Sequence, residues 1–342
     1  MNGKLKSILK LHLTSQEHDL SAEQRDSLRT FCESMSRVRI LYRGIDDKYL
    51  HKVYNTGLEN PPLLSEYIFL FGDKSRHFLR GVDDNKKVYD INDLSGSVFE
   101  TIYEKLHLIF IEPEKIKDPK SREVVKQFVE KEQEALNFFQ EKKKEDWLRR
   151  ILSLSSQQRQ NVKDYYLAFL HTVGEKICGD SYGLSTSTDL EVVKRFAVHN
   201  NKKGIILVGW ISAKEKNIIK LMCGGDKEIK KLKKMKMELP VFSNKLYKGQ
   251  KEITLKCGLL PHFIVGYIYG DKWENFEVNP YIFQIEDYSK IKKEGLPIDQ
   301  SEFLSKITGT HFTMYFQNYE EQYWQLELDE IFPGIKFSDV GL

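Results

Sequence analysis

The sequence lacks the features by which several large classes of protein are recognised. Its four cysteines are scattered, at Cys32, Cys178, Cys223 and Cys257, and no two of them form a CxxC pair. Neither a disulfide framework nor a zinc site is therefore indicated, and a reducing compartment is the simplest interpretation. No apolar stretch approaches the length of about 18 residues that a membrane span requires, so no contact with a membrane is predicted.

Targeting and nucleotide-binding signatures are equally scarce. The segment MNGKLKSILKLHL begins with positive charge, but Lys10 and His12 interrupt its apolar run, which makes it a poor signal peptide. We therefore expect a cytoplasmic protein. Neither a Walker A motif nor a Rossmann glycine fingerprint is present. The formal net charge of +3 is too small to argue for or against a nucleic-acid partner.

Apolar patterns predict a mixture of helices and strands. The start of the chain, about 2–36, is predicted to be helical and polar. Helical spacing of apolar residues covers 119–178, where a second helix starts near Gln157. A short buried strand is predicted at 38–44, and apolar runs predict strands at 204–211 and 262–269. A late pair of strands or a hairpin is predicted at 311–317 and 322–328. Because helices and strands do not alternate regularly, an α+β fold is favoured over a doubly wound sheet.

The segment YKGQKEITL, residues 247–255, predicts a strand with a polar face. Alternation along a strand places Gln250 and Glu252 on one face, while Ile253 and Leu255 look like core residues. A strand packed on a core usually carries apolar residues on one face, so its polar face is either solvated or part of a functional site.

The segment GLSTSTDLEVVKRFA, residues 183–197, predicts a strand that leads into a helix. Thr188 and Glu191 fit a capping box, so the helix is expected to begin at Asp189. Hydroxyl groups and unpaired backbone N–H groups would then meet where a polar ligand can bind. The alternative interpretation is that the hydroxyl residues only cap the helix.

The segment LYRG, residues 41–44, places Arg43 at the end of a predicted strand. An arginine in this position can bind a phosphate or a carboxylate through two parallel hydrogen bonds. The alternative interpretation is an ordinary surface ion pair.

Taken in this order, LYRG, STS and QKE resemble the three motifs of the R-S-E class of mono-ADP-ribosyltransferases, a family that includes many bacterial toxins. The family pattern is an aromatic-Arg-Gly strand, a Ser-Thr-Ser strand running into a helix, and a Gln/Glu-x-Glu strand. The later segment LKCGLLPHFIVGY resembles the strand-turn-strand that normally follows. The resemblance covers about 38–45 and 180–270.

The resemblance implies one ADP-ribosyltransferase-like domain over 1–342, with a two-sheet β core. Arg43 and Ser185 are separated by more chain than a minimal member would have, so 112–178 is interpreted as a helical insertion. Residues 275–342 are interpreted as a C-terminal extension. Either region can be additional core, or can bind a target, an inhibitor or another partner.

The implied reaction cleaves the nicotinamide–ribose bond of NAD⁺ and transfers ADP-ribose to a macromolecule, without a metal. By resemblance, Glu252 hydrogen-bonds a ribose hydroxyl and stabilises the oxocarbenium-like transition state. Arg43 and Gly44 lie at the NAD⁺ phosphates, and Ser185 positions Glu252 or the nicotinamide end. Thr186 and Ser187 of the Ser-Thr-Ser strand are also assigned to the cofactor site. So is Phe196 of the following helix, which packs either on nicotinamide or in the helix core.

The acceptor is predicted from Gln250, which by resemblance contacts the incoming nucleophile. An amide both donates and accepts hydrogen bonds, which suits an amide side chain or a nucleobase better than arginine. Phe242 and Tyr247, in the family's target-recognition loop, can stack on a base, pack on a protein or pack inward.

The segment GGDKEIKKLKKMKMELP carries six lysines between Lys227 and Lys236 and predicts a short basic helix. Such a run is either a solvated face or a phosphate-binding patch. We expect a nucleic acid, RNA or DNA, slightly ahead of a protein acceptor. An intracellular toxin with an antitoxin, an antiviral defence effector and an injected effector all fit, and a catalytically silent binding module of the same fold is the alternative from another class.

Overall fold

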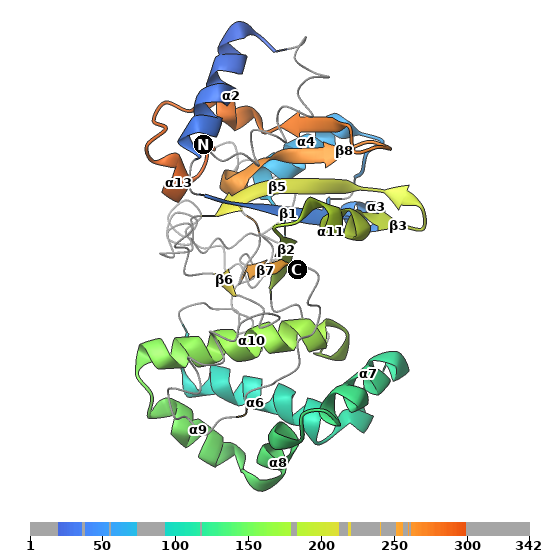
Figure 1. The fold of residues 1–342 in the computed structure, drawn as a ribbon, viewed down its shortest axis with the longest axis vertical. Coiled ribbons are helices and arrows are strands. Elements are labelled where there is room, and N and C mark those ends of the chain that lie inside the picture. The colour runs from blue at the N-terminus through green and yellow to red at the C-terminus, as the bar shows by residue number, and fades with distance from the viewer. Residues whose placement is uncertain are drawn as a thin grey trace, which may run out of the picture. The chain divides into compact units, whose positions relative to one another are not determined.

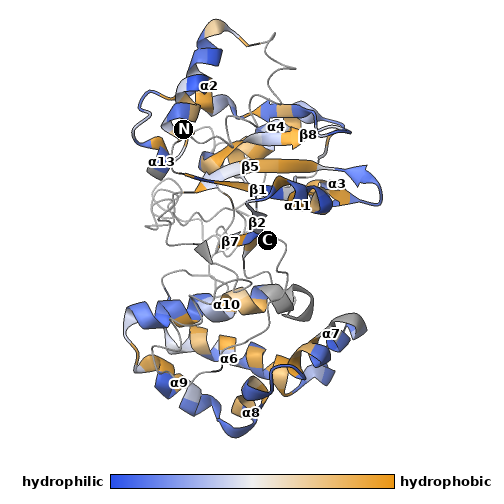
Figure 2. Ribbon diagram, in the orientation of Figure 1, coloured by the Kyte–Doolittle hydropathy of each residue, from blue (hydrophilic) through white to orange (hydrophobic). Residues whose placement is uncertain are grey.

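Strand β5 (Ile205–Ile211) is buried along its whole length, as expected for an apolar run that is covered on both faces. It pairs antiparallel with β1 (Arg39–Ile45) on one side and with β8 (Ile264–Tyr269) on the other. These three strands confirm the strands predicted at 38–44, 204–211 and 262–269. Figure 2 shows β5 coloured largely as hydrophobic residues.

The structure is a computed structural model, and it describes residues 20–35, 38–54, 56–73, 93–116, 118–178, 183–211, 218–219, 240, 251–255, 259 and 261–298. The chain divides into two compact units, which are described separately. Unit 1 comprises 1–81, 185–216 and 258–342, and unit 2 comprises 82–184 and 217–257.

Unit 1 holds most of the sheet (Figure 1). Its strands follow one another in the order β2, β1, β5, β8, β9, and the pairs whose register is defined are antiparallel. A two-residue turn at Asn200 and Asn201, both with positive φ, joins a separate pair of short strands. The strands not yet given are β2 (Leu184–Ser187), β3 (Val198–His199), β4 (Lys202–Lys203) and β9 (Asn275–Val278).

Short helices pack on this sheet. Phe31 of α2 contacts Trp210 of β5 edge-on, with ring centroids 5.7 Å apart, and Ser65 of α4 hydrogen-bonds the Tyr267 hydroxyl at 2.7 Å. The helices of unit 1 are α2 (Ala22–Ser34), α3 (Asp47–Tyr54), α4 (Pro61–Phe71), α11 (Leu190–Lys194) and α13 (Ile291–Glu294), with 3₁₀ turns η3 (Arg195–Ala197), η4 (Pro261–Phe263) and η5 (Pro280–Gln284).

Unit 2 is built from helices around one aromatic core. Trp147 is completely buried, donates its indole N–H to the Phe99 carbonyl at 3.3 Å, and contacts the rings of Phe139 and Tyr166. The helices are α6 (Gly96–Phe110), α7 (Pro119–Val129), α8 (Gln133–Glu141), α9 (Lys144–Leu152) and α10 (Ser156–Cys178), with the 3₁₀ turn η2 (Pro113–Lys115). A short antiparallel pair, β6 (Ile218–Ile219) and β7 (Glu252–Leu255), completes the described part of the unit.

The described chain is therefore a mixed helix-and-strand protein with an antiparallel sheet, as the α+β prediction stated. The predicted helix near Gln157 is α10, and the helical region begins with α6, ahead of the predicted insertion at 112. The predicted basic helix at 227–236 and the late strands at 311–317 and 322–328 lie outside the described residues. Among the described helices, none combines the length and the apolar character needed to cross a bilayer.

Candidate active site

Arg43 lies on β1 of unit 1, paired in register with Leu207 of β5. Its side chain is 18% exposed. Nε donates to Oδ2 of Asp73 at 3.0 Å, and Nη1 donates to the main-chain oxygen of Ser185 at 3.2 Å. The guanidinium carbon also lies 5.9 Å from the ring centroid of Tyr49. The arginine thus forms the ion pair that its alternative interpretation predicted, although with a buried partner rather than at the surface.

Asp73 is completely buried, and the backbone around it determines where its carboxylate points. Its main-chain N–H and C=O both pair with Leu259, each at 2.9 Å. The preceding Gly72 has φ +65, and a Cβ there would lie 2.2 Å from the Leu259 oxygen, so this approach requires glycine. The second carboxylate oxygen accepts a hydrogen bond from the Tyr49 hydroxyl at 3.3 Å. Both carboxylate oxygens therefore have donors, as a buried carboxylate requires.

Strand β2 carries the predicted Ser-Thr-Ser motif next to β1, with Ser187 opposite Tyr42. Thr186 and Ser187 are buried, and the Ser187 hydroxyl accepts the N–H of Asp189 at 3.0 Å. Ser185 is half-buried and is the residue whose main chain meets Arg43. The first and second predicted motifs therefore lie together in unit 1. The Ser187 hydroxyl thus stabilises the backbone where the chain leaves the strand.

The helix after β2 starts one residue later than predicted. Asp189 is the N-cap of α11, and its carboxylate accepts the N–H of Glu191 at 3.0 Å. The predicted capping box, with Thr188 as the cap and Asp189 as the first helical residue, is wrong. A carboxylate at this end is favoured by the helix dipole as well as by the hydrogen bond.

Phe196 is 52% exposed, so its interpretation as a helix-core residue is wrong. It belongs to η3, whose backbone lies directly on β1. A Cβ at Gly44 would lie 2.5 Å from the Val193 oxygen and 3.0 Å from the Ala197 nitrogen. Gly44 therefore allows the segment that carries Phe196 to approach the strand that carries Arg43.

Glu252 begins β7 in unit 2, and its side chain is 10% exposed. Its Oε1 lies 3.5 Å from Nε2 of His171 on α10 and accepts a hydrogen bond from the Thr254 hydroxyl at 3.2 Å. His171 is 4% exposed and Thr254 is fully buried. Behind them, a Cβ at Gly183 would lie 2.6 Å from the Thr254 methyl group, so the chain just before β2 is closely packed on β7. The predicted catalytic carboxylate is thus held by two polar groups in a site with little exposure to water.

The strand that carries Glu252 is shorter than the predicted 247–255. β7 starts at Glu252, and Lys251 before it has φ +45, which is not an extended conformation. Ile253 and Leu255 are both buried, as predicted for core residues, and Thr254 between them is buried as well. Among the described residues, the alternation of the strand therefore begins at Glu252.

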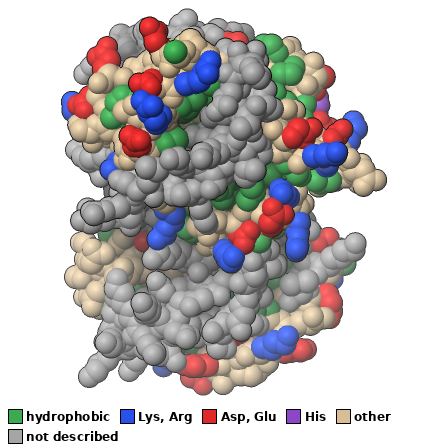
Figure 3. Space-filling view, turned by 45° about the horizontal axis from the view of Figure 1, so that its top comes forward, with side chains coloured by type: hydrophobic (Ala, Val, Ile, Leu, Met, Phe, Trp, Pro, Cys, Tyr) green, Lys and Arg blue, Asp and Glu red, His purple; other side chains and the backbone are tan. Residues whose placement is uncertain are grey.

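The residues predicted to bind the acceptor are not among those that the structure describes. Gln250, Phe242, Tyr247 and the lysines of 227–236 all lie outside the described residues. On the face drawn in Figure 3, acidic and basic side chains are interspersed over the described surface.

Three residues in these two sets of side chains, one set in each unit, were not predicted from the sequence. His171 lies among apolar residues of α10, Asp73 follows an apolar helix, and Tyr49 is an ordinary member of α3. None of them belongs to a motif with fixed spacing. A carboxylate directly after a glycine, in FGD at 71–73, is the local signal that could have singled out Asp73.

Tyr42, next to Arg43 on β1, keeps its proton over the physiological range. Burial, together with the nearby Asp189 carboxylate, raises its pKa to about 12. Tyr42 is therefore a neutral hydroxyl group, and the charge at this point of β1 is the guanidinium of the neighbouring Arg43.

The chain has no match among protein-family models, among curated proteins or among solved structures. The chemistry of the two sets of side chains is therefore the basis for assigning a function. Unit 1 offers a guanidinium, a hydroxyl-rich strand and an exposed aromatic ring. Unit 2 offers a carboxylate with an imidazole and a hydroxyl on the same oxygen, which can stabilise a developing positive charge or act as a base.

Proposed function

We propose that the protein is an NAD⁺-dependent mono-ADP-ribosyltransferase of the R-S-E type. The observation that supports this most directly is the 3.2 Å hydrogen bond from Arg43 Nη1 to the Ser185 main chain, which brings together two motifs 142 residues apart. In this proposal the antiparallel sheet is part of a two-sheet transferase core, 112–178 is an insertion in it, and 275–342 is an extension.

The reaction breaks the bond between the nicotinamide nitrogen and C1′ of the ribose. Nicotinamide leaves as a neutral molecule with the bonding electron pair, and positive charge develops on the ribose. Glu252 stabilises this charge, because a hydrogen bond from the Thr254 hydroxyl fixes its carboxylate in a largely buried site. The acceptor then bonds to C1′ and loses a proton.

Binding of NAD⁺ is assigned to unit 1. Arg43, whose side chain is 18% exposed, interacts with the diphosphate, while Asp73 fixes its orientation. Phe196 offers an exposed ring to nicotinamide. Gln250, Phe242 and Tyr247 are the predicted acceptor-binding residues, with a nucleic acid base favoured over a protein side chain.

Release of nicotinamide from NAD⁺ tests this proposal. The wild-type protein, with cell extract as a source of acceptor, is compared with Glu252→Gln and with Glu134→Gln, which changes an exposed glutamate of α8. We expect release from the wild type and from the α8 variant, and loss of about 100-fold or more with Glu252→Gln. Equal rates in all three proteins would overturn the assignment of Glu252.

A second function, a catalytically silent binding module, is favoured by one observation. Arg43 is already paired with the completely buried Asp73, so its charge has a structural partner without any ligand. Absence of nicotinamide release by the wild type, with and without extract, would select this second function.

The acceptor is identified by a separate experiment. Labelled NAD⁺ is added to a lysate containing the enzyme, and the labelled material is divided between RNase, DNase and protease treatments. Label released by a nuclease supports the predicted nucleic acid acceptor, and label released only by protease supports a protein target.

A further inference from the structure

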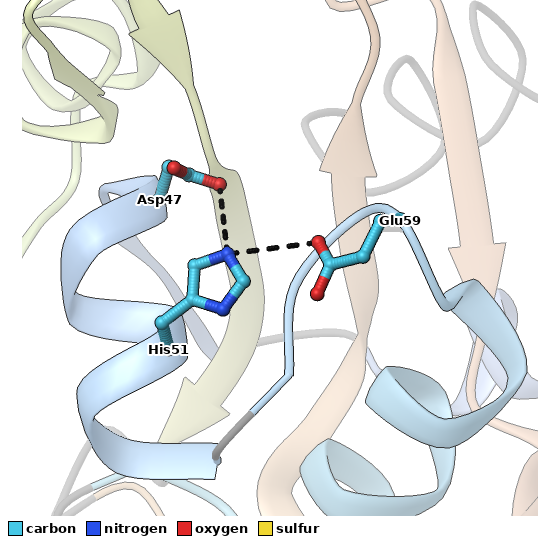
Figure 4. Close-up of side chains that lie close together, drawn as sticks. All are labelled: Asp47, His51 and Glu59. Atoms are coloured by element: carbon cyan, nitrogen blue, oxygen red, sulfur yellow. Dashed lines mark ion pairs between the residues drawn. The ribbon is translucent and has the colours of Figure 1, made fainter.

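Two carboxylates and one imidazole of unit 1 point toward one another (Figure 4). Asp47 and His51 are one turn apart on α3, so they lie on the same face of this eight-residue helix. Glu59 comes from the turn before α4. His51 Nε2 lies 3.5 Å from Oδ1 of Asp47 and 3.6 Å from Oε2 of Glu59, and all three ligand atoms lie within 4.8 Å of one another.

These separations fit a metal ion better than direct hydrogen bonds. A charged N–H···O bond closes to about 2.7–2.9 Å, which is much shorter than either contact of His51 Nε2. Ligand atoms about 2.0–2.2 Å from a tetrahedral Zn²⁺ are separated from one another by about 3.3–3.6 Å, which matches both contacts. The third edge, between the two carboxylates, is within 4.8 Å, and the Glu59 side chain, which is 58% exposed, has space to shorten it when an ion binds.

The other oxygen of each carboxylate is held by a second group. The Gly57 N–H donates to Oε1 of Glu59 at 2.9 Å, and the Lys202 ammonium lies 3.8 Å from Oδ2 of Asp47. The Gly57 N–H is the kind of outer partner that orients a ligand of a protein metal site, whereas the Lys202 ammonium competes with a metal ion for the Asp47 carboxylate. Gly57 also leaves space for the ligand atoms, because a Cβ there would lie 2.6 Å from Glu59 Oε2 and 2.9 Å from His51 Nε2.

We propose that Asp47, His51 and Glu59 bind a divalent transition-metal ion, with water at the fourth coordination position. One imidazole with two carboxylates suits Zn²⁺ or Mn²⁺, whereas Mg²⁺ prefers oxygen ligands alone. The cysteine count does not predict this site, because its ligand set contains no cysteine. The competing explanation is a surface ion triad in which a protonated His51 bridges the carboxylates. The proposal is independent of ADP-ribosyl transfer.

Zn²⁺ titration of the full-length, tag-free protein by calorimetry tests the proposal, with Mg²⁺ as the contrasting ion. We expect one Zn²⁺ per chain, and weakening by at least about tenfold with His51→Ala and with the conservative Glu59→Gln. His107→Ala, which changes a half-buried histidine of α6, is the matched control and should bind as the wild type does. Lys202→Met removes the competing cation and should tighten binding.

Visible absorption with Co²⁺ in place of Zn²⁺ gives a second measurement that does not depend on the heat of binding or on activity. A tetrahedral spectrum in the wild type that disappears in Glu59→Gln supports the site. Absence of saturable Zn²⁺ binding to the wild type, or equal binding by all variants, would overturn it in favour of the ion triad.

Discussion

Arg43 and Asp73 form an ion pair in which the carboxylate is completely buried and the guanidinium is 18% exposed. The pair joins β1 to the end of α4, because Asp73 follows that helix and its main chain is bridged to Leu259. Arg43, which we propose binds the NAD⁺ phosphates, is therefore also a structural residue of unit 1. Its structural and functional roles can be separated by choosing the substitutions with this pair in mind.

Substitution of Arg43 by alanine should destabilise the protein by about 3 kcal/mol, because Asp73 is left as a buried carboxylate without its main counter-charge. The double variant Arg43→Met with Asp73→Asn should recover much of this loss, since no unpaired charge is left in the pair. Urea denaturation of the single and double variants measures both values. A double variant as unstable as the sum of its parts would show that the pair is not coupled.

Substitution of Gly44 by alanine should cost about 1–3 kcal/mol of stability. The added Cβ would lie 2.5 Å from the Val193 oxygen, and backbone cannot move away as a flexible side chain can. Gly96→Ala in α6 is the matched control, because the nearest atom to its Cβ is a Leu152 methyl at 3.6 Å. That variant should be neutral or slightly stabilising, and equal losses in the two variants would contradict the packing explanation.

The sheet could be predicted from the sequence because its strands carry their own signal. The run GIILVGWI is apolar without interruption, and the strand found there is buried at every position. The motif order also predicted that Arg43 and Ser185 lie together. The start of α11, which was placed one residue early, shows the usual limit of cap prediction, since Thr188 and Asp189 are both good caps.

The other contacts of the candidate residues, within each unit, depend on tertiary structure. His171 meets Glu252 because α10 and β7 lie together in unit 2, and no sequence spacing reveals that contact. The positive φ of Lys251 is likewise invisible in YKGQKEITL, because a lysine between two polar residues is compatible with a strand. Asp73 is fixed by its bridge to Leu259, a residue from a distant part of the chain.

Substitution of Phe196 by alanine should leave stability within about 0.5 kcal/mol of the wild type, because half of this side chain is exposed. If the ring contacts nicotinamide as proposed, the same variant should raise KM for NAD⁺. Val193→Ala is the contrasting variant, since Val193 is 3% exposed and its truncation should lower stability. A Phe196 variant with unchanged stability and unchanged KM would remove this residue from the proposed site.

Stability should decrease in mild acid because of His262. Burial lowers the pKa of this histidine from its ordinary 6.5 to about 4. The unfolded chain therefore binds a proton more readily than the folded protein between these values, so stability is complete above about pH 6.5 and is lost as the pH falls toward 4. Because the residue is partly exposed, the loss is at most about 2 kcal/mol. His262→Gln should flatten the pH profile of the free energy of unfolding in this window, and an unchanged slope would contradict the assignment.

Substitutions at three positions, Glu252, Thr254 and His171, should show which feature of the Glu252 carboxylate matters for the proposed reaction. Glu252→Gln keeps the shape but removes the charge, so nicotinamide release should be lost with little change in stability. Thr254→Val removes the hydroxyl that donates to Oε1 at 3.2 Å, and should reduce kcat several-fold while costing about 1 kcal/mol of stability.

His171 is a positioning residue in this scheme, since its imidazole lies 3.5 Å from the same oxygen. His171→Ala should lower kcat more than it changes KM for NAD⁺, because unit 1 provides the residues assigned to cofactor binding, and His171→Gln should restore part of kcat by offering a replacement donor. Rates of nicotinamide release over a range of NAD⁺ concentrations separate the two constants. A purely structural histidine would instead change thermal stability alone, and a variant with wild-type kcat would exclude any role for His171 in orienting the carboxylate.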